Sequence, residues 1–150
     1  MFAWLQRLLR GRREPLTPAA RRGAEGERLA AGYLHGRLGY EIAACNWRNP
    51  RDRREEIDLV CRDGEALVFV EVKSRAAAAL VPGYEAVTRR KRRVLRRAIH
   101  AYLTRLRIRP RTFRFDVVEV SAAGGATAPQ IRHYQNVSLF PKGYQVLRPD

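Results

Sequence analysis

The fold is decided by one stretch, Glu55-Glu56-Ile57-Asp58-Leu59-Val60-Cys61-Arg62-Asp63-Gly64-Glu65-Ala66-Leu67-Val68-Phe69-Val70-Glu71-Val72-Lys73. It contains two β-rich runs joined at Asp63-Gly64, a dipeptide typical of a type I′ hairpin turn because glycine accepts a positive φ. With these two residues as the whole loop, Arg62 faces Glu65 and Asp58 faces Phe69. Glu71 is then diagonal to Asp58, roughly 7–8 Å away on the same face.

Strand alternation sorts the side chains of this hairpin onto two faces. One face is apolar and is expected to point into a core; it holds Ile57, Leu59, Val68, Val70 and Val72. The other face holds Glu56, Asp58, Phe69, Glu71 and Lys73. Carboxylates and an ammonium group in the middle of a hydrophobic hairpin are costly unless they are paired or bind a metal.

Asp58 and Glu71 have the chemistry of a magnesium site. Mg²⁺ typically takes one or two protein carboxylates, several waters and a substrate phosphate. Lys73 points the same way as Glu71, one pleat further, where it can hold a water or a phosphate oxygen. The alternative is an ordinary salt bridge on a solvated strand face, and the Asp…Glu-x-Lys pattern alone does not exclude it.

Composition indicates a single domain with a polyanionic partner. The 150 residues include 30 Lys and Arg against 15 Asp and Glu, a net charge of +15. Such an excess favours nucleic acid first and an acidic membrane surface second, although a merely soluble basic surface is the alternative. Cys45 and Cys61 have no metal-ligand or redox spacing, so we expect reduced thiols and a cytoplasmic location. No apolar run approaches membrane-spanning length.

The elements around the hairpin follow from caps, periodicity and turn residues. A first helix is expected from the cap Thr17 to about Arg37, and a second from the cap Thr88 to about Leu106. Further strands are expected at 40–47, 111–120 and 130–134. The order α-β-β-β-α-β predicts an α/β fold with a mixed central sheet flanked by helices, over residues 17–135. Residues 1–16 are expected to be a flexible basic extension, and 136–150 an irregular C-terminal tail.

Two acidic residues outside the hairpin have unusual positions. Glu27 shares the apolar stripe of the first helix with Ala30 and Leu34. It is either a partly buried carboxylate paired with an arginine or a third acidic ligand aimed at the hairpin. Asp116 lies in a strand, where capping a neighbouring backbone is favoured over orienting a base. The histidines, including His133, are expected to be structural or solvated.

The second helix begins with a charge distribution that opposes its dipole. Its first turns hold Arg89, Arg90, Lys91, Arg92 and Arg93, although the macrodipole favours acidic residues there. Phosphate binding explains the placement, because the helix N-terminus and the basic side chains favour the same anion. Lys91 is also placed to turn toward the acidic site. Arg48 and Arg75 are further candidate contacts to nucleic acid.

These features together resemble the YraN family, uncharacterised bacterial proteins assigned by fold to the restriction-endonuclease-like, or PD-(D/E)XK, superfamily. The matching residues are Gly26-Glu27, Asn46-Trp47-Arg48, Glu56-Ile57-Asp58-Leu59, Val68 to Lys73 with Arg75, Ala86-Val87-Thr88 with Lys91, Arg114 to Val118, and the C-terminal His133 and Asn136. The chain departs from the family at one position, because Glu55 stands where the family usually has glycine.

The resemblance implies this fold and an ancestral metal site but brings no known substrate. Together with the residues above, it leads us to expect a divalent-metal-dependent endonuclease that hydrolyses phosphodiester bonds of DNA. Asp58 and Glu71 would hold Mg²⁺ or Mn²⁺, and Glu27 would bind the metal directly or through water. Lys73 would position the attacking water and stabilise charge in the transition state. Branched or single-stranded DNA is the expected substrate, since no base-reading element is evident.

Two other functions are compatible with the sequence. One is a non-catalytic module that binds DNA, or RNA in association with the ribosome, and retains the nuclease fold. The other is a structural adaptor that uses its basic surface for protein or membrane contacts. The set Asp58, Glu71 and Lys73 favours the enzyme, because a pure binder does not need carboxylates beside a polyanion. DNA is expected before RNA as the partner, and a homodimer is left open.

Overall fold

The computed structural model describes residues 17–75, 87–121 and 128–145, so the predicted extension at 1–16 lies outside the described residues. The helices are α2 (Pro18–Gly36) and α3 (Arg89–Arg105). The strands are β1 (Glu41–Asn49), β2 (Asp52–Asp63), β3 (Ala66–Arg75), β4 (Thr112–Ser121) and β5 (Gln130–Tyr134). This order confirms the predicted α/β fold with its α-β-β-β-α-β core.

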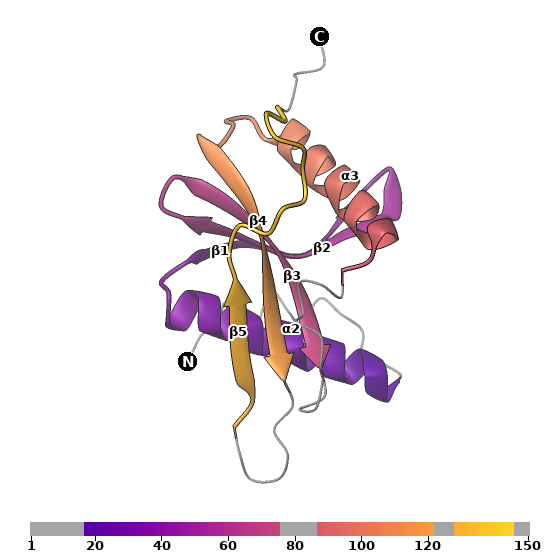
Figure 1. Cartoon of the computed structure of the whole chain (residues 1–150), viewed down its shortest axis with the longest axis vertical. Helices are drawn as coiled ribbons and strands as arrows, with labels where there is room; N and C mark the ends of the chain where they lie inside the picture. The colour runs from indigo at the N-terminus through magenta and orange to yellow at the C-terminus, as the bar shows by residue number, and fades with distance from the viewer. Residues whose placement is uncertain (1–16, 76–86, 122–127, 146–150) are drawn as a thin grey trace.

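One mixed sheet carries all of these strands, in the order β1-β2-β3-β4-β5. The pair β3–β4 is parallel, and the other neighbouring pairs are antiparallel. A parallel pair needs a crossover connection, and α3 lies between β3 and β4 in the chain. In Figure 1, α2 crosses the lower half of the sheet and α3 lies beside its upper half.

Each face of the sheet packs on one helix. Against α2, with Ala30, Ala31 and Leu34, lie Leu59, Val68, Val70, Val118 and Val120. Against α3, with Leu95, Ala98, Ile99 and Leu103, lie Val60, Leu67, Phe69, Phe115 and Val117. Because both faces are covered, the central strands are apolar along most of their length. Phe69, predicted to share a face with charged groups, is therefore fully buried.

The predicted register of the β2–β3 hairpin is wrong by two residues. Asp63 pairs with Ala66, and the turn consists of Gly64 and Glu65. Gly64 has a φ of 57°, whereas neither Asp63 nor Glu65 has a positive φ. These dihedrals fit a type II′ turn, which needs glycine only at its first central position, whereas the predicted type I′ turn would force Asp63 into a strained conformation. A shift of two residues preserves the face of every side chain.

Ile57 is the exception to the predicted faces, because it packs on the α3 side while Leu59 packs on the α2 side. Its partner Trp47 also lies on the α3 side, whereas Cys45, which pairs with Leu59, lies on the α2 side. Between Cys45 and Trp47 stands Asn46, with a φ of 51°. This left-handed residue interrupts the alternation and turns the ends of both strands toward α3.

Both helices begin where the caps predict. Thr17 Oγ1 accepts from Ala20 N at 3.1 Å, and Thr88 Oγ1 accepts from Lys91 N at 3.2 Å. A threonine at this position satisfies one of the backbone donors that a helix start leaves open. The residue at which α3 begins, and with it the place of Lys91 in the first turn, is therefore set by a local sequence signal.

The described part of the C-terminal segment returns along α3 and completes the core (Figure 1). Leu139 is buried in the cluster under α3. Arg92 Nη1 donates to Ser138 O at 2.7 Å, and Arg96 Nη1 donates to Leu139 O at 3.1 Å. Residues 135–145 form no helix or strand, but these contacts anchor them to the domain.

Candidate functional site

The acidic site forms where β2 and β3 separate. Their backbone pairing ends at Leu59 and Val70, and the next residues outward are Asp58 and Glu71. There the Asp58 side chain, and not the β2 backbone, is the hydrogen-bond acceptor for β3: its Oδ2 accepts from Val72 N at 2.8 Å. This bond places one carboxylate beside the strand that carries the other. The structure thus brings Asp58 and Glu71 together, as the sequence predicts.

Glu71 is a buried carboxylate with one free oxygen. The residue is only 3% exposed. Its Oε1 lies 3.1 Å from Lys73 Nζ and 3.5 Å from Lys91 Nζ, so both lysines reach the site. Its Oε2 is buried and has no hydrogen-bond partner among the described residues. An unsatisfied buried carboxylate oxygen is costly, so a water, an ion or a ligand is expected at this atom.

Glu27 approaches the same site from α2. The helix comes close to β3 at Gly26, where a Cβ would collide with Ser74 Oγ, and that hydroxyl donates to Arg22 O at 3.2 Å. Glu27 is buried. The pKa of the Asp58 carboxyl lies well above its usual range because it is withdrawn from water and repelled by the charges of Glu71 and Glu27. All three carboxylates therefore interact electrostatically.

The donor set fits a hard divalent cation of the magnesium type. Among residues 17–75, 87–121 and 128–145, no three Asp, Glu, His or Cys side chains are grouped closely enough to hold a metal by themselves. Mg²⁺ does not require three, since one or two carboxylates with waters and a phosphate complete its shell. Asp58 and the free oxygen of Glu71 supply that number, and Glu27 is left with an indirect role.

Asn46 is a component of this region that sequence reasoning missed as a site residue. The register of β1 and β2 places it across from Asp58. Its Oδ1 is, with Glu71 Oε2, one of two buried side-chain oxygens without a hydrogen-bond partner in the described part of the chain. The available signal was an asparagine inside a strand pattern, since asparagine tolerates the left-handed backbone that breaks the alternation there.

The predicted nucleic-acid contacts divide into two groups. Arg89, Arg90 and Arg93 are exposed and make no hydrogen bond or ion pair to any described residue. Arg90 and Arg93, with Arg97, line a hollow of about 180 Å³ against the β1–β2 turn. These side chains are accessible to solvent.

The remaining predicted contacts have other positions. Arg92 donates to the carbonyls of Val87 and Ser138, so it is occupied in holding the C-terminal segment. Arg48 lies 3.2 Å from Glu56 in a partly exposed ion pair, and Arg75 ends β3. The structure does not gather Arg48, Arg75 and Arg92 with the exposed arginines of α3.

Glu55, the departure from the family pattern, does not disturb the strand. It is buried, and its Oε2 accepts from Asn49 Nδ2 at 2.7 Å. Strand β2 runs through this position without interruption from Asp52 to Asp63. The bond ties Glu55 to the β1–β2 turn.

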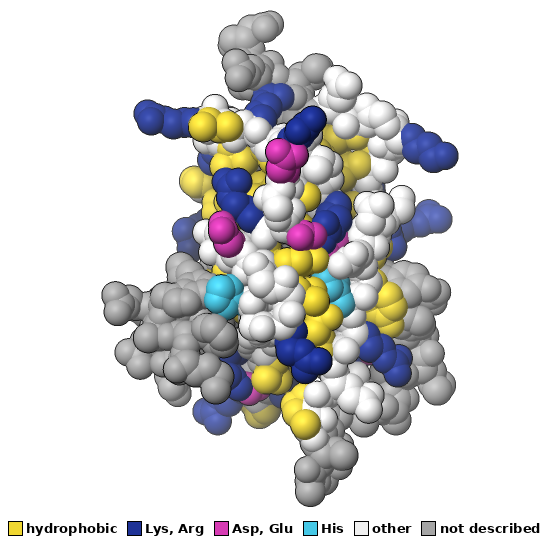
Figure 2. Space-filling model, turned by 90° about the vertical axis from the view of Figure 1, so that its left-hand side faces the viewer, with side chains coloured by type: hydrophobic (Ala, Val, Ile, Leu, Met, Phe, Trp, Pro, Cys, Tyr) yellow, Lys and Arg dark blue, Asp and Glu magenta, His cyan; other side chains and the backbone are white. Residues whose placement is uncertain are grey.

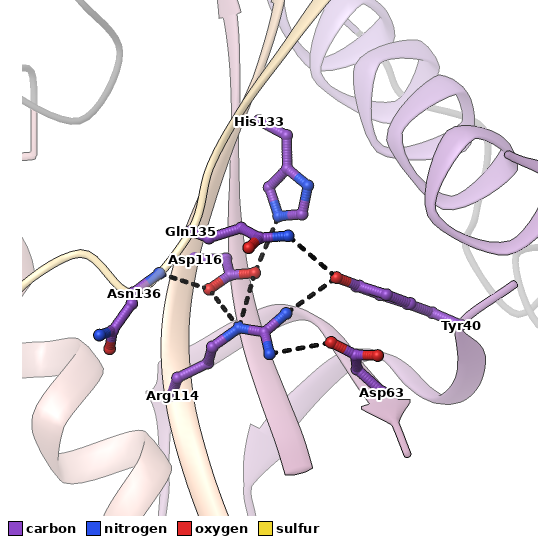
Figure 3. Close-up of polar contacts among 7 residues, drawn as sticks. All are labelled: Tyr40, Asp63, Arg114, Asp116, His133, Gln135 and Asn136. Atoms are coloured by element: carbon purple, nitrogen blue, oxygen red, sulfur yellow. Dashed lines mark hydrogen bonds and ion pairs between the residues drawn. The ribbon is translucent and has the colours of Figure 1, made fainter. Parts of the chain in front are cut away.

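A second polar cluster surrounds Asp116 (Figure 3). Its Oδ1 accepts from Asn136 N at 2.9 Å and from Arg114 Nε at 3.0 Å, and its Oδ2 accepts from His133 Nε2 at 2.8 Å. Arg114 also binds Asp63 and the hydroxyl of Tyr40. The backbone bond to Asn136 confirms that Asp116 caps a neighbouring segment, and His133 is structural. The cluster joins β4 to β5 and to the end of β2.

Replacing Asp116 with asparagine is expected to lower the free energy of unfolding by about 2 kcal/mol at neutral pH, because hydrogen bonds to a charged group are removed. Burial opposes ionisation, but the bonds from His133, Asn136 N and Arg114 together hold the pKa of Asp116 below its usual value. Its stabilisation is therefore present above pH 4 or so and is lost as the pH falls further.

Urea unfolding of both proteins between pH 7 and pH 3 measures this effect. The difference between wild type and Asp116→Asn should shrink toward pH 3, and a difference that does not change with pH would contradict the assignment. Glu65→Gln is the matched control. It breaks an ion pair with Arg111 in which both side chains are exposed, so its effect should be within about 0.5 kcal/mol.

Further features concern the surface, the thiols and the helices of the described residues. The face of the molecule shown in Figure 2 carries a mixture of basic, acidic and hydrophobic side chains. At the start of α3, by contrast, Arg89, Arg90 and Arg93 are exposed close together in the sequence. Cys45 and Cys61 are free thiols, and burial raises the pKa of Cys45 to about 11. No helix in the described ranges has the length and apolar character needed to cross a membrane.

Comparison with known proteins assigns a family but no activity. The model of the family described as "Uncharacterised protein family UPF0102" matches residues 26–120. A UPF0102 protein of Chlorobaculum tepidum is 47% identical over 100 residues, which cover 67% of this chain and 74% of the relative. A UPF0102 protein of Geobacter sulfurreducens is 44% identical over 114 residues, which cover 76% and 85%. One of Symbiobacterium thermophilum is 49% identical over 98 residues, covering 65% and 80%.

Proposed function

The chain belongs to the uncharacterised protein family UPF0102, and from this premise we propose that it is a divalent-metal-dependent endonuclease acting on DNA. The family membership agrees with the resemblance to YraN-like proteins. The further link to the PD-(D/E)XK superfamily is part of the proposal. It is supported by the α-β-β-β-α-β core and by the position of Asp58, Glu71 and Lys73 at the point where β2 and β3 separate.

One observation carries the proposal. Glu71 is buried, yet its Oε2 has no hydrogen-bond partner among the described residues, and it lies beside a second carboxylate whose pKa is raised. Burial and the repulsion of Asp58 by Glu71 and Glu27 outweigh the attraction of Lys91 and so raise the pKa of Asp58; a bound metal cation would offset that repulsion. The site therefore has the electrostatics of a cation site beside a surface suited to phosphate.

Each residue has a distinct role in hydrolysis. Asp58 and Glu71 would hold Mg²⁺ or Mn²⁺, which supplies a Lewis acid for the scissile phosphate and lowers the pKa of a bound water. Lys73, 3.1 Å from Glu71 Oε1, orients the attacking water and stabilises negative charge on the phosphate oxygens. Lys91 adds positive charge from α3. Glu27 acts indirectly: it orients a water molecule, and its charge makes the electrostatic potential of the site more negative.

A cleavage screen tests the proposal. Labelled blunt duplex, single-stranded DNA, branched DNA and RNA are incubated with the protein in Mg²⁺, in Mn²⁺ and in EDTA. We expect cleavage of at least one DNA substrate that requires the metal, and none in EDTA. Absence of metal-dependent cleavage on every substrate would instead favour a non-catalytic nucleic-acid-binding module, which the exposed arginines of α3 also support.

Binding to DNA is expected to be mainly electrostatic. Replacing Arg89, Arg90 and Arg93 together with glutamine should weaken affinity for all sequences. The slope of log affinity against log salt should fall by roughly 0.9 for each phosphate that the protein no longer neutralises, or about 2.7 for three phosphates. Anisotropy titrations at several salt concentrations measure this slope.

A variant with the same change in net charge provides the control. Three exposed arginines lie away from α3: Arg22 on α2, Arg37 directly after α2, and Arg132 on β5. Their joint replacement by glutamine should leave most of the slope of log affinity against log salt intact. If the slope falls equally in the two triple variants, the binding surface is not on α3.

A further inference from the structure

The loop between α3 and β4 exposes an apolar residue among arginines. Ile108 is 84% exposed, and the other exposed large hydrophobic residue in the described part of the chain, Leu38, is 39% exposed. The flanking Arg107 is also exposed and makes no hydrogen bond or ion pair to a described residue. A single exposed isoleucine is common on protein surfaces. What distinguishes Ile108 is that a hollow with aromatic and basic walls begins at the same loop.

That hollow has a volume of about 560 Å³, within the range of ligand sites, and it begins at the same loop. Its walls include Arg109, Arg111, Phe113, Asn136, Phe140 and Tyr144. Phe140 and Tyr144 are stacked at 4.3 Å, and Phe113 meets Phe140 edge-on at 5.6 Å. The Tyr144 hydroxyl lies 2.6 Å from His100 Nδ1 on α3. These rings are only half-buried, so they can contact a bound planar group.

The charges around the hollow favour a nucleic-acid strand over an apolar partner. Arg107 and Arg109 lie on either side of Ile108, and Arg111 stands at the rim in an exposed ion pair with Glu65. Aromatic rings surrounded by arginines bind unpaired bases, because the rings stack on bases and the guanidinium groups contact phosphates. A protruding apolar side chain is suited to insertion between base pairs.

The hollow and the acidic site lie along the same face of the sheet, the one that α3 covers. Phe113 pairs in register with Leu67 on β3, and Leu67 lies on the face that α3 covers, as does Glu71. On α3, Lys91 reaches Glu71, and Arg93 and Arg97 are exposed further along the helix. Arg105 near the helix end is also exposed, but it donates to Ala101 O and Asn49 Oδ1. The rise from Lys91 to Arg105 is about 21 Å. That length corresponds to roughly six steps of a DNA strand at 3.4 Å each.

We propose that the α3–β4 corner binds the junction between double-stranded and single-stranded DNA in a branched substrate. Ile108 stacks on the last base pair and separates the strands, and the hollow lined by Phe113, Phe140 and Tyr144 takes the unpaired bases. The arginines of α3 hold the phosphates of the duplex, which runs toward Asp58 and Glu71. This inference rests on the proposed function for its DNA partner and for the cleavage, which it predicts roughly six nucleotides from the junction.

The test compares two DNA molecules in EDTA, so that binding is measured without chemistry. One is a blunt duplex, and the other is the same duplex with a single-stranded arm and 2-aminopurine at the junction. Wild type should bind the armed duplex on the order of tenfold more tightly, as expected for one stacked base, and should raise the 2-aminopurine fluorescence. Ile108→Ser should reduce the preference to about twofold or less and abolish the fluorescence rise.

Leu38→Ser is the matched control, because it removes an exposed apolar side chain at the end of α2 and should retain both the preference and the fluorescence rise. Equal affinity of wild type for the two DNA molecules, or an Ile108→Ser protein that keeps the tenfold preference, would overturn the inference. A protein that shows the preference but never cleaves DNA would overturn the proposed chemistry alone. The two failures are therefore distinguishable.

Discussion

Metal-dependent cleavage of DNA is expected to fall by at least about 10²-fold when Lys73 is replaced by alanine. Lys73 Nζ lies 3.1 Å from Glu71 Oε1, next to the pair of carboxylates. Its ammonium group is the positive charge closest to Glu71 among the described residues, so its removal takes away stabilisation of charge that develops on the phosphate. Lys91, at 3.5 Å from the same oxygen, can offset only part of that effect.

Single-turnover cleavage with saturating protein separates this effect from binding. Affinity for DNA should change by no more than about twofold, because one of 30 Lys and Arg residues is removed. Lys142→Ala is the control, since Lys142 is exposed in the C-terminal segment and the variant should cleave at the wild-type rate. A Lys73→Ala protein that cleaves within about threefold of wild type would exclude the assigned role.

Replacing Asp58 with asparagine is expected to leave the stability of the metal-free protein unchanged or to raise it, on the order of 1 kcal/mol. The Asp58 carboxylate is withdrawn from water and lies near two other carboxylates, which raises its pKa. Asparagine has the same shape and can still accept from Val72 N through its amide oxygen. The substitution therefore removes repulsion while keeping the hydrogen bond.

The alternative explanation of the site predicts the opposite sign. If Asp58, Glu71 and Lys73 formed only a structural ion-pair network, removal of one carboxylate would leave a poorly compensated positive charge and lower the stability. Urea unfolding in EDTA compares the two proteins directly. Glu119→Gln serves as a control for the removal of a buried carboxylate elsewhere in the sheet, and it should not stabilise the protein.

The fold was predictable where the signal is local. The caps Thr17 and Thr88 set the starts of both helices, because a helix start needs a side-chain acceptor whatever lies around it. The faces of β3 follow from the period of two, which survives a shift of register by two residues. For this reason Glu71 and Lys73 could be placed on one face although the pairing partner of Asp58 was predicted incorrectly.

The remaining features depend on contacts that a local pattern does not contain. The turn at Gly64 was assigned to the wrong pair of residues because the dipeptide Asp63-Gly64 also suits a type I′ turn, and the choice of II′ depends on the backbone of both strands. Ile57 changes face because Asn46 on the neighbouring strand is left-handed. Arg92 resembles its neighbours in the sequence, yet it binds Ser138 O, 46 residues away.

The candidate site was predictable in its members but not in its electrostatics. The spacing of Glu71 and Lys73 within one strand is visible in the sequence, and so is the position of Glu27 on the apolar stripe of its helix. The free oxygen of Glu71 is not visible, because it results from the way Lys73 and Lys91 both approach Oε1. The Asp116 cluster likewise requires β5 to bring His133 beside β4.

Thermal unfolding of wild type and Asp58→Asn, with and without Mg²⁺ or Mn²⁺, tests the metal site most directly because it requires no substrate. A metal that binds only the native state stabilises it by about 2.7 kcal/mol at 100 times its dissociation constant. We predict that added metal raises the melting temperature of wild type and leaves that of Asp58→Asn unchanged. A wild type that shows no metal-induced shift, together with a metal-free Asp58→Asn protein that is clearly less stable than wild type, would contradict a metal site at Asp58 and Glu71.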